Sequence, residues 1–474
     1  LASVLAAFGV RRAVTFAHMV AAAAGPDADP WPTLERAMAD PDTLGIAAAE
    51  YLTPSVRKTW QALKPERREL LQLLSRFSLT KEQVERFYVI EQRDPALTDE
   101  AIIANPYLLF EADRDQQEAV PFSVIDRGCF PDAKIASAYP LPKPTAMDDE
   151  LDARRVRALL IDELQRAKSA GHTLRPQADI VNSIRARHLS VPCPVTADVL
   201  DAHGLSADTL PPGGPLTGVT LPNGVPALQL TELAEVGALI REQVERRLKA
   251  ADIPGAPDFA ALLDEALGPI RSDLTDDERE AETRARAEKV AALETLYSSR
   301  ISVLIGPAGT GKTTLLKVLR HTPSVAAGGV LLVAPTGKAR VQLAQQVQAE
   351  AVTLAQFLIR SGRYDPQRER YLVTGDPQSR AKHYKTVVVD EASMLTEEQL
   401  AALLDAVAGV QRLVLVGDPR QLPPIGAGRP FVDIVRRLAP DDLDTRAPRC
   451  APGYAELTIP RRQAGDDRDD LVLA

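Results

Sequence analysis

One glycine-rich segment has the residue types and spacing that hold phosphate groups. Residues 306–313 read Gly-Pro-Ala-Gly-Thr-Gly-Lys-Thr, which satisfies Gly-x-x-x-x-Gly-Lys-Thr in full. Glycines let backbone N–H groups turn around a phosphate, and the N-terminus of a following helix adds positive potential. We expect Lys312 to contact the β- and γ-phosphates and the Thr313 hydroxyl to bind Mg²⁺. The predicted nucleotide-binding residues are Gly306, Gly309, Thr310, Gly311, Lys312, Thr313 and Thr314.

Two adjacent carboxylates follow a run of valines. Asp390 and Glu391 come directly after residues 386–389, which read as a buried strand. A carboxylate at the end of a parallel strand faces the same crevice as the phosphate loop. Asp390 is therefore predicted to bind Mg²⁺. Glu391 is predicted to orient or deprotonate the attacking water.

Two further loops carry polar side chains after apolar runs. Residues 417–424 read Gly-Asp-Pro-Arg-Gln-Leu-Pro-Pro, and prolines restrict such a loop. Gln421 is the candidate sensor of the γ-phosphate, with a purely structural turn as the alternative. Lys338 and Arg340 open a helix after residues 330–334. They are either solvated or bind backbone phosphates of nucleic acid.

Short β-branched runs must position these loops. The runs Ile301–Ile305, Val330–Ala334, Thr386–Val389 and Leu413–Val416 alternate with helical patterns, including Thr314–Leu319 after the phosphate loop. Apolar strands between helices predict an α/β fold with a parallel sheet that is buried on both faces.

Four blocks in order carry a family resemblance: 306–314, 334–340, 387–394 and 413–431. Together they resemble RecD-like superfamily-1 DNA helicases of the 5′→3′ type. The resemblance implies a RecA-like P-loop NTPase fold, ATP and Mg²⁺ as cofactors, and single-stranded or tailed DNA as partner. It also implies catalytic roles for Lys312, Glu391, Gln421 and Arg462. Gln421 would be the coupling residue. Arg462 would contact the γ-phosphate, with Arg461 as the alternative for that role. The implied strand-contacting residues are Thr336, Lys338, Arg340, Thr353 and Gln356.

Two departures from the family pattern limit what is carried over. The position where such helicases read adenine with a glutamine aligns with Lys289, which puts adenine specificity in doubt. The chain also ends at Ala474, just past the block that contains Arg462. We therefore expect a fragment that lacks the second motor domain. This fragment is expected to bind nucleotide but to turn it over inefficiently.

The first half of the chain reads as mainly α-helical. Thr53 before Pro54 predicts a helix N-cap, and Thr80 with Gln83 predicts a capping box. The expected domains are a helical domain over 1–145, a mainly helical region over 146–285, the RecA-like motor domain 1A over 286–440, and the start of a second motor domain over 441–474. The second of these is expected to hold a helix-hairpin-helix or winged-helix-like unit, with a short hairpin near 211–224.

Composition restricts the classes of protein that fit. The 474 residues include 56 Lys+Arg and 65 Asp+Glu, a net charge of −9, which excludes an evenly basic nucleic-acid coat protein but not a local basic groove. Three scattered cysteines are typical of isolated thiols in a reducing compartment, so we expect a cytoplasmic protein. No apolar run is long enough for a membrane span, and no membrane partner is expected.

Three functional interpretations stay open. The chain is either part of an unwinding enzyme or an ATP-gated DNA-binding regulatory ATPase that does not unwind. A conjugative relaxase-type helicase is a further possibility, although the six histidines are scattered. The basic segment 360–385 lies where related helicases insert a strand-separating pin, and either such a hairpin or a plain surface loop is expected there.

Overall fold

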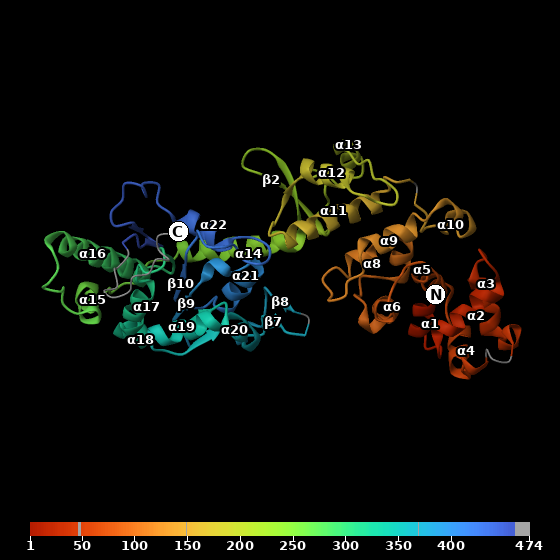
Figure 1. Cartoon of the computed structure of the whole chain (residues 1–474), viewed down its shortest axis with the longest axis horizontal. Helices are drawn as coiled ribbons and strands as arrows, with labels where there is room; N and C mark the ends of the chain where they lie inside the picture. Colours follow the sequence, from red (N-terminus) through yellow and green to blue (C-terminus); the bar gives the residue numbers. More distant parts are fainter. Residues whose placement is uncertain (46–48, 148, 368, 460–474) are drawn as a thin grey trace. The chain divides into compact units, whose positions relative to one another are not determined.

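The chain folds into two compact units, which are shown in Figure 1. The computed structural model describes residues 1–45, 49–147, 149–367 and 369–459. The first unit contains Leu1–Ala167 and Leu174–Leu230, and the second contains Lys168–Thr173 and Thr231–Ala474. The four predicted domains are a finer division of the chain and stay a prediction.

Helices dominate the first part of the first unit. Both predicted N-termini are confirmed, because Thr53 accepts a hydrogen bond from the Val56 N–H and Thr80 forms a capping box with Gln83. The helices are α1 (Ala2–Ala7), α2 (Ala13–Ala24), α3 (Pro30–Ala39), α4 (Pro54–Gln61), α5 (Pro65–Leu74), α6 (Lys81–Tyr88), α7 (Asp99–Ala104), α8 (Leu108–Glu111), α9 (Phe122–Cys129) and α10 (Ala133–Ala138).

The rest of the first unit mixes helices with a small antiparallel sheet. Its elements are α11 (Ala153–Ser169), β1 (Arg175–Pro176), α12 (Gln177–Ala186), α13 (Ala197–Ala202), β2 (Leu216–Thr220) and β3 (Pro226–Leu230). The strands lie in the order β1-β3-β2, and the turn between β2 and β3 makes the predicted hairpin, slightly later in the chain than expected. The predicted helix-hairpin-helix or winged-helix-like unit in this region stays a prediction.

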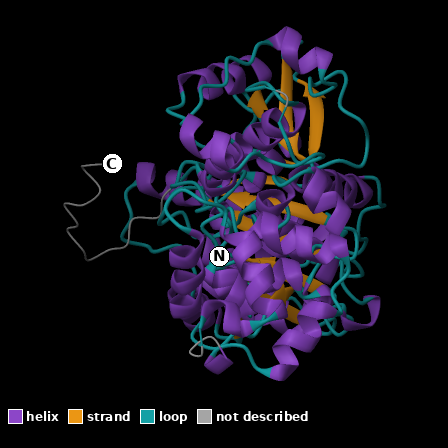
Figure 2. Ribbon diagram, turned by 90° about the vertical axis from the view of Figure 1, so that its right-hand side faces the viewer, coloured by secondary structure: helices purple, strands orange, loops and turns teal. Residues whose placement is uncertain are grey.

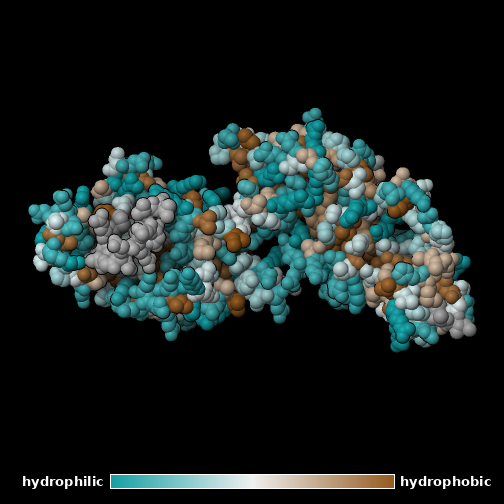
Figure 3. Space-filling model, in the orientation of Figure 1, coloured by the Kyte–Doolittle hydropathy of each residue, from teal (hydrophilic) through white to brown (hydrophobic). Residues whose placement is uncertain are grey.

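The surface in Figure 3 is mostly hydrophilic on the face shown, and its hydrophobic residues lie in separate spots. Within the described residues, no helix combines the length and the apolar character that crossing a membrane requires.

The second unit is built on a seven-stranded sheet. Its strand order is β11-β12-β4-β10-β9-β5-β6, and all neighbours are parallel except β11 and β12. The strands are β4 (Ile301–Ile305), β5 (Val330–Ala334), β6 (Ala351–Thr353), β9 (Thr386–Val389), β10 (Arg412–Gly417), β11 (Cys450–Ala451) and β12 (Tyr454–Glu456); β7 (Tyr364–Asp365) and β8 (Arg370–Tyr371) form a separate hairpin.

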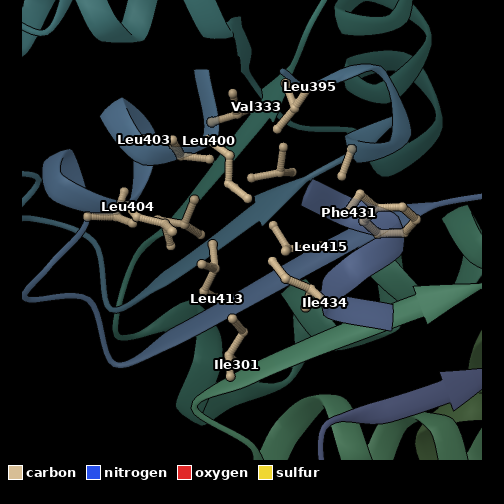
Figure 4. Packing of buried hydrophobic residues seen from close by; sticks show 14 of the residues in the cluster. Ile301, Val333, Leu395, Leu400, Leu403, Leu404, Leu413, Leu415, Phe431 and Ile434 are labelled. Carbon is tan, nitrogen blue, oxygen red and sulfur yellow. The ribbon is translucent and has the colours of Figure 1, made fainter. Parts of the chain in front are cut away.

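Helices pack against both faces of this sheet. Figure 2 distinguishes the helices, strands and loops of the chain by colour. The helices are α14 (Thr231–Leu248), α15 (Phe259–Leu267), α16 (Asp276–Ser298), α17 (Lys312–His321), α18 (Pro323–Ala326), α19 (Gly337–Val347), α20 (Leu354–Arg360), α21 (Glu397–Ala406) and α22 (Pro430–Leu438). Successive strand residues point to opposite faces. Leu413 and Leu415 accordingly join the cluster under α14 and α20–α22, part of which Figure 4 shows, and Val414 and Val416 join the cluster under α15–α19.

The sequence patterns located the central strands closely. Three of the four predicted strands have the expected bounds, and the fourth extends one residue further at each end. The α/β P-loop NTPase fold class with a RecA-like parallel sheet is confirmed. The helix after the phosphate loop was predicted from Thr314 but begins at Lys312, because Gly311 adopts a left-handed conformation and serves as its N-cap.

The core under the sheet predicts a sharp difference between two substitutions. Leu415 is fully buried at the centre of the sheet, and Ile425 is fully exposed on a loop. We expect Leu415→Ala to lower the free energy of unfolding by about 2–5 kcal/mol, since it removes packed methyl groups and leaves a cavity. Ile425→Ala should change it by less than about 0.5 kcal/mol. Urea unfolding of both variants measures this, and equal losses would contradict the described packing.

Candidate nucleotide and nucleic-acid site

The phosphate loop joins a buried strand to a helix. All five residues of β4 are buried, and Gly306 follows them with φ 153°. A Cβ at Gly306 would lie 2.6 Å from the Leu457 carbonyl oxygen, so only glycine fits there. Gly309 and Gly311 have φ of 80° and 92°, which other residues rarely adopt. The loop is therefore shaped by glycines at the positions that the motif requires.

The Lys312 side chain forms hydrogen bonds to the backbone of the phosphate loop. Its Nζ donates to the Gly306 carbonyl at 2.6 Å and to the Pro307 carbonyl at 3.0 Å. The Thr310 hydroxyl also donates to the Pro307 carbonyl, at 2.9 Å. Because Lys312 and Thr313 open α17, they lie in its first turn, where backbone N–H groups lack partners within the helix.

Three carboxylates share the electrostatic environment of Lys312. Asp390 follows β9, Asp418 follows β10, and β10 lies between β9 and β4 in the sheet. Burial lowers the pKa of Lys312, and Asp418, Glu391 and Asp390 oppose this change. Burial raises the pKa of Asp390, and burial together with Asp390 raises the pKa of Glu391. The site therefore holds more negative than positive groups in a partly buried place.

This arrangement fits a nucleotide with a divalent cation. Oxygen ligands are those that Mg²⁺ prefers. The Asp390 carboxylate follows β9 and the Thr313 hydroxyl lies in the first turn of α17, at the same edge of the sheet. The open backbone around Gly309 has no atom within 4 Å of a Cβ position, which leaves room for phosphate oxygens. Gly306, Thr310, Gly311 and Thr314 belong to the same loop and helix start.

Sequence reasoning missed Asp418 as a member of this site. The residue acts on Lys312 and also organises its own loop, since its Oδ1 accepts from the Arg420 N–H at 2.9 Å. A signal for it existed in the sequence. Asp418 follows a buried strand almost directly, as Asp390 does, and the carboxyl ends of neighbouring parallel strands meet at one edge.

The loop that carries Gln421 is tied to the carboxylate segment. The Ser393 hydroxyl donates to Gln421 Oε1 at 3.4 Å, and Ser393 lies two residues after Glu391. At the start of this loop, a Cβ at Gly417 would lie 3.0 Å from the Phe431 ring. Gln421 itself is exposed. The structure thus places Gln421 beside the carboxylate segment, and its coupling role stays a prediction.

The predicted strand-contacting residues follow two neighbouring strands. Ala334 of β5 pairs with Thr353 of β6, so Thr336 and Thr353 lie near the same edge of the sheet. Thr336 Oγ1 accepts from the Ala339 N–H as the N-cap of α19, and Thr353 forms a capping box with Gln356 at the start of α20. Their side chains cap helices in the described state.

The two basic residues of this group, Lys338 and Arg340, lie in the first turn of α19. Lys338 is exposed and Arg340 is half-buried. They stand at the same sheet edge as the phosphate loop, since β5, β9, β10 and β4 run parallel.

Two other predicted positions have different outcomes. Lys289 is 2% exposed in α16, and its Cε lies 3.1 Å from a Cβ position at Gly311. The position expected to read adenine therefore places an alkyl-ammonium chain against the phosphate loop. Arg462 and its rival Arg461 lie outside the described residues.

A hairpin occupies part of the segment 360–385. Tyr364 and Tyr371 pair across β7 and β8 with ring centroids 4.8 Å apart. At its base, Arg363 is fully buried and donates from Nε and Nη2 to Asp405 of α21, at 3.0 and 2.8 Å. The hairpin alternative is thus confirmed as a structure, and its use as a pin stays a prediction.

Comparison with known proteins supports the RecA-like fold assigned to the second unit. Residues 284–445 match the model of a family described as AAA domain. The chain is 37% identical over 168 residues to the RecBCD enzyme subunit RecD of Mycolicibacterium smegmatis, which covers 32% of the chain and 30% of that protein. It is 34% identical over 149 residues to the ATP-dependent RecD2 DNA helicase of Deinococcus radiodurans, covering 31% of the chain and 20% of that protein.

A conjugal transfer protein matches the same chain. The identity to TraA of Agrobacterium fabrum is 37% over 187 residues, covering 39% of the chain and 14% of TraA. The chain thus spans less than a third of the length of each of these relatives. The matches confirm the predicted resemblance to RecD-like superfamily-1 helicases.

Loss of the Lys312 ammonium should weaken nucleotide binding. We expect Lys312→Ala to reduce ATP affinity by about 30-fold or more, because a charge-assisted contact to phosphate is lost. Lys317→Ala on the same helix is the matched control and should bind as the unmodified chain does. Isothermal titration calorimetry measures the ATP affinity of both variants. Equal affinities would show that Lys312 does not contact the nucleotide.

The environment of Glu397 predicts that the free energy of unfolding depends on pH. The Glu397 N–H donates to the Ala427 carbonyl, so it supports the end of the Gln421 loop. Burial, with Asp433 and Glu398 nearby, raises the pKa of Glu397 to about 7. A raised pKa means that the folded state binds the proton more tightly, so this contribution is complete below about pH 4.5 and is lost as the pH rises through 7.

Substitution of Glu397 by glutamine removes this proton equilibrium. Between pH 5 and pH 8 the unmodified chain should lose up to about 3 kcal/mol of unfolding free energy relative to Glu397→Gln. Urea unfolding of both proteins at several pH values gives the difference. Parallel pH curves would show that Glu397 is ionised in the folded chain throughout this range.

Proposed function

We propose that the protein carrying this chain is an ATP-dependent helicase or translocase that moves 5′→3′ along single-stranded DNA. One observation carries the proposal: a single edge of the parallel sheet holds the phosphate loop, the Asp390 and Glu391 segment, and the starts of α19 and α20. A nucleotide at this edge is positioned to act on elements that hold a strand.

The residues of the nucleotide site have different roles in binding and hydrolysis. Lys312 and the backbone of the phosphate loop bind the nucleotide phosphates, and Thr313 with Asp390 would hold Mg²⁺, which neutralises phosphate charge when bound. Glu391 orients or deprotonates the attacking water. Gln421 is bonded to Ser393 and links the state of the carboxylate segment to its own loop. Arg462 would act on the γ-phosphate.

The strand is held by groups on α19 and α20. Lys338 and Arg340 supply positive charge to backbone phosphates without reading the base sequence. Thr336, Thr353 and Gln356 offer polar side chains at the helix starts. Since these side chains cap their helices in the described state, a bound strand must share or replace those hydrogen bonds.

Strand displacement separates this proposal from a regulatory ATPase. We expect the full-length protein to unwind a duplex with a 5′ single-stranded tail in the presence of ATP and Mg²⁺, and Lys312→Ala to abolish unwinding. ATP hydrolysis without displacement on either tail polarity would support the ATP-gated, non-unwinding alternative instead. The TraA match keeps a relaxase-type helicase as a second candidate, which covalent attachment to a nicked strand would reveal.

The β7–β8 hairpin provides a more specific test. Shortening the loop between Asp365 and Arg370 leaves the buried Arg363–Asp405 pair intact. We expect this variant to keep DNA-stimulated ATP hydrolysis and to lose at least about tenfold in unwinding rate, since a pin acts only on the duplex junction. A matched change in the loop after α15, between Gly268 and Ser272, is the control. Unchanged unwinding would show that the hairpin is not a pin.

A further inference from the structure

A basic groove lies on the second unit, away from the nucleotide site. It has a volume of about 570 Å³ and eleven lining residues. Five of these are cationic and none is acidic. They are Arg246, Arg247, Arg300, Lys382 and Lys385, accompanied by Tyr384. Such a concentration of one charge differs from the chain as a whole, which has a net charge of −9.

The groove sits at the opposite edge of the sheet from the phosphate loop. Arg300 directly precedes β4, Lys385 directly precedes β9, and the lining residue Gln411 directly precedes β10. Their loops are joined, because the Arg412 N–H donates to the Lys385 carbonyl and the Leu413 N–H donates to the Arg300 carbonyl. A five-residue strand is about 16 Å long. The groove lies at the ends where the strands begin, and the nucleotide site lies at the ends where they finish, so the strand length separates them.

The cations of the groove lack anionic partners. Within the described residues, none of the five forms an ion pair with a carboxylate. Arg247 is 6% exposed and donates to the Val410 and Val407 carbonyls at 2.9 and 2.6 Å, while its Nε is buried without a partner in the described structure. Buried charges are normally paired, so this guanidinium points to an anion that the groove receives.

Neighbouring cations in and beside the groove repel one another. Burial and Arg246 lower the pKa of Arg247 to about 10. Arg412, which follows the lining residue Gln411, is 3% exposed, and burial with Arg300 lowers its pKa to about 10 as well. A guanidinium with a pKa near 10 remains charged at neutral pH. An incoming phosphate would relieve the repulsion between these groups.

We propose that this groove binds the phosphodiester backbone of single-stranded DNA and that Tyr384 stacks on one of its bases. The proposal rests on the proposed function and adds a second contact region for the same strand, outside the α19 and α20 blocks. Several cations in one groove suit a backbone that carries one charge per nucleotide. Tyr384 lines the groove and is 37% exposed. Aromatic rings beside a cationic groove are the means by which proteins hold single strands without reading sequence.

The test uses three exposed cations of the groove, Arg246, Lys382 and Lys385, replaced together by alanine. Binding of a fluorescent oligothymidine to the chain is followed by anisotropy at several salt concentrations. We expect the affinity to fall by at least about tenfold and the slope of log affinity against log salt to fall by about 2. The control replaces Arg284, Arg320 and Arg436, which removes the same charge elsewhere on this unit. Equal effects of the two triple variants would overturn the proposal.

Separate readouts distinguish this proposal from the proposed function. If Lys338→Ala with Arg340→Ala weakens binding but the groove variant equals its control, only the groove proposal fails. If the unmodified chain binds no DNA, the proposed function fails with it. Inorganic phosphate or an acidic polypeptide that binds the groove while oligothymidine does not would likewise overturn the DNA assignment.

Tyr384 gives an independent check that does not change charge. Tyr384→Ala should weaken oligothymidine binding by about 5- to 100-fold, as expected for one lost stacking contact. Tyr384→Phe keeps the ring and should restore binding to within about twofold. Equal losses in both variants would show that the ring does not stack on a base.

Discussion

The parallel order of β4, β10 and β9 is the constraint on which the rest of the second unit depends. Because these strands are neighbours and run in one direction, their ends bring Lys312 close to Asp390, Glu391 and Asp418. One ammonium among three partly buried carboxylates is poorly balanced. A divalent cation would supply positive charge beside the carboxylates, and a polyphosphate would supply acceptors for Lys312. The backbone direction of three buried strands therefore sets the chemistry of the site.

The same constraint separates the two edges of the sheet. Loops that follow strands hold the nucleotide site and the starts of α19 and α20, and loops that precede strands hold the basic groove. The surroundings of these two places differ in charge. Asp390, Glu391 and Asp418 lie near Lys312, whereas five cations and no acidic residue line the groove. The net charge of −9 averages over this difference and conceals it.

Much of the fold could be predicted because its signals are local. Continuous apolar runs gave the bounds of β4, β5 and β9, and the glycine pattern gave the phosphate loop. The Thr-x-x-Gln pattern shows both the strength and the limit of such signals. It predicted the capping box at Thr80, and the same pattern at Thr353 also caps a helix, although it was interpreted there only through the family resemblance.

What could not be predicted depends on residues that are distant in the sequence. The groove combines Arg246 of α14 with Arg300 and Lys385, and no local pattern brings these segments together. The buried pair of Arg363 and Asp405, which anchors the hairpin, is likewise separated by 42 residues. Asp418 was missed for another reason. Its loop was interpreted through Gln421, although its place after a buried strand was visible.

The Mg²⁺ dependence of ATP binding tests the central claim most directly. Titration calorimetry of ATP with the chain, with and without Mg²⁺, should show tighter binding when the cation is present. In Asp390→Asn most of that gain should be lost, since a metal ligand is replaced by a neutral amide. ATP affinity that is independent of Mg²⁺ in the unmodified chain, or an equal gain in the variant, would contradict a carboxylate site built for a metal-bound nucleotide.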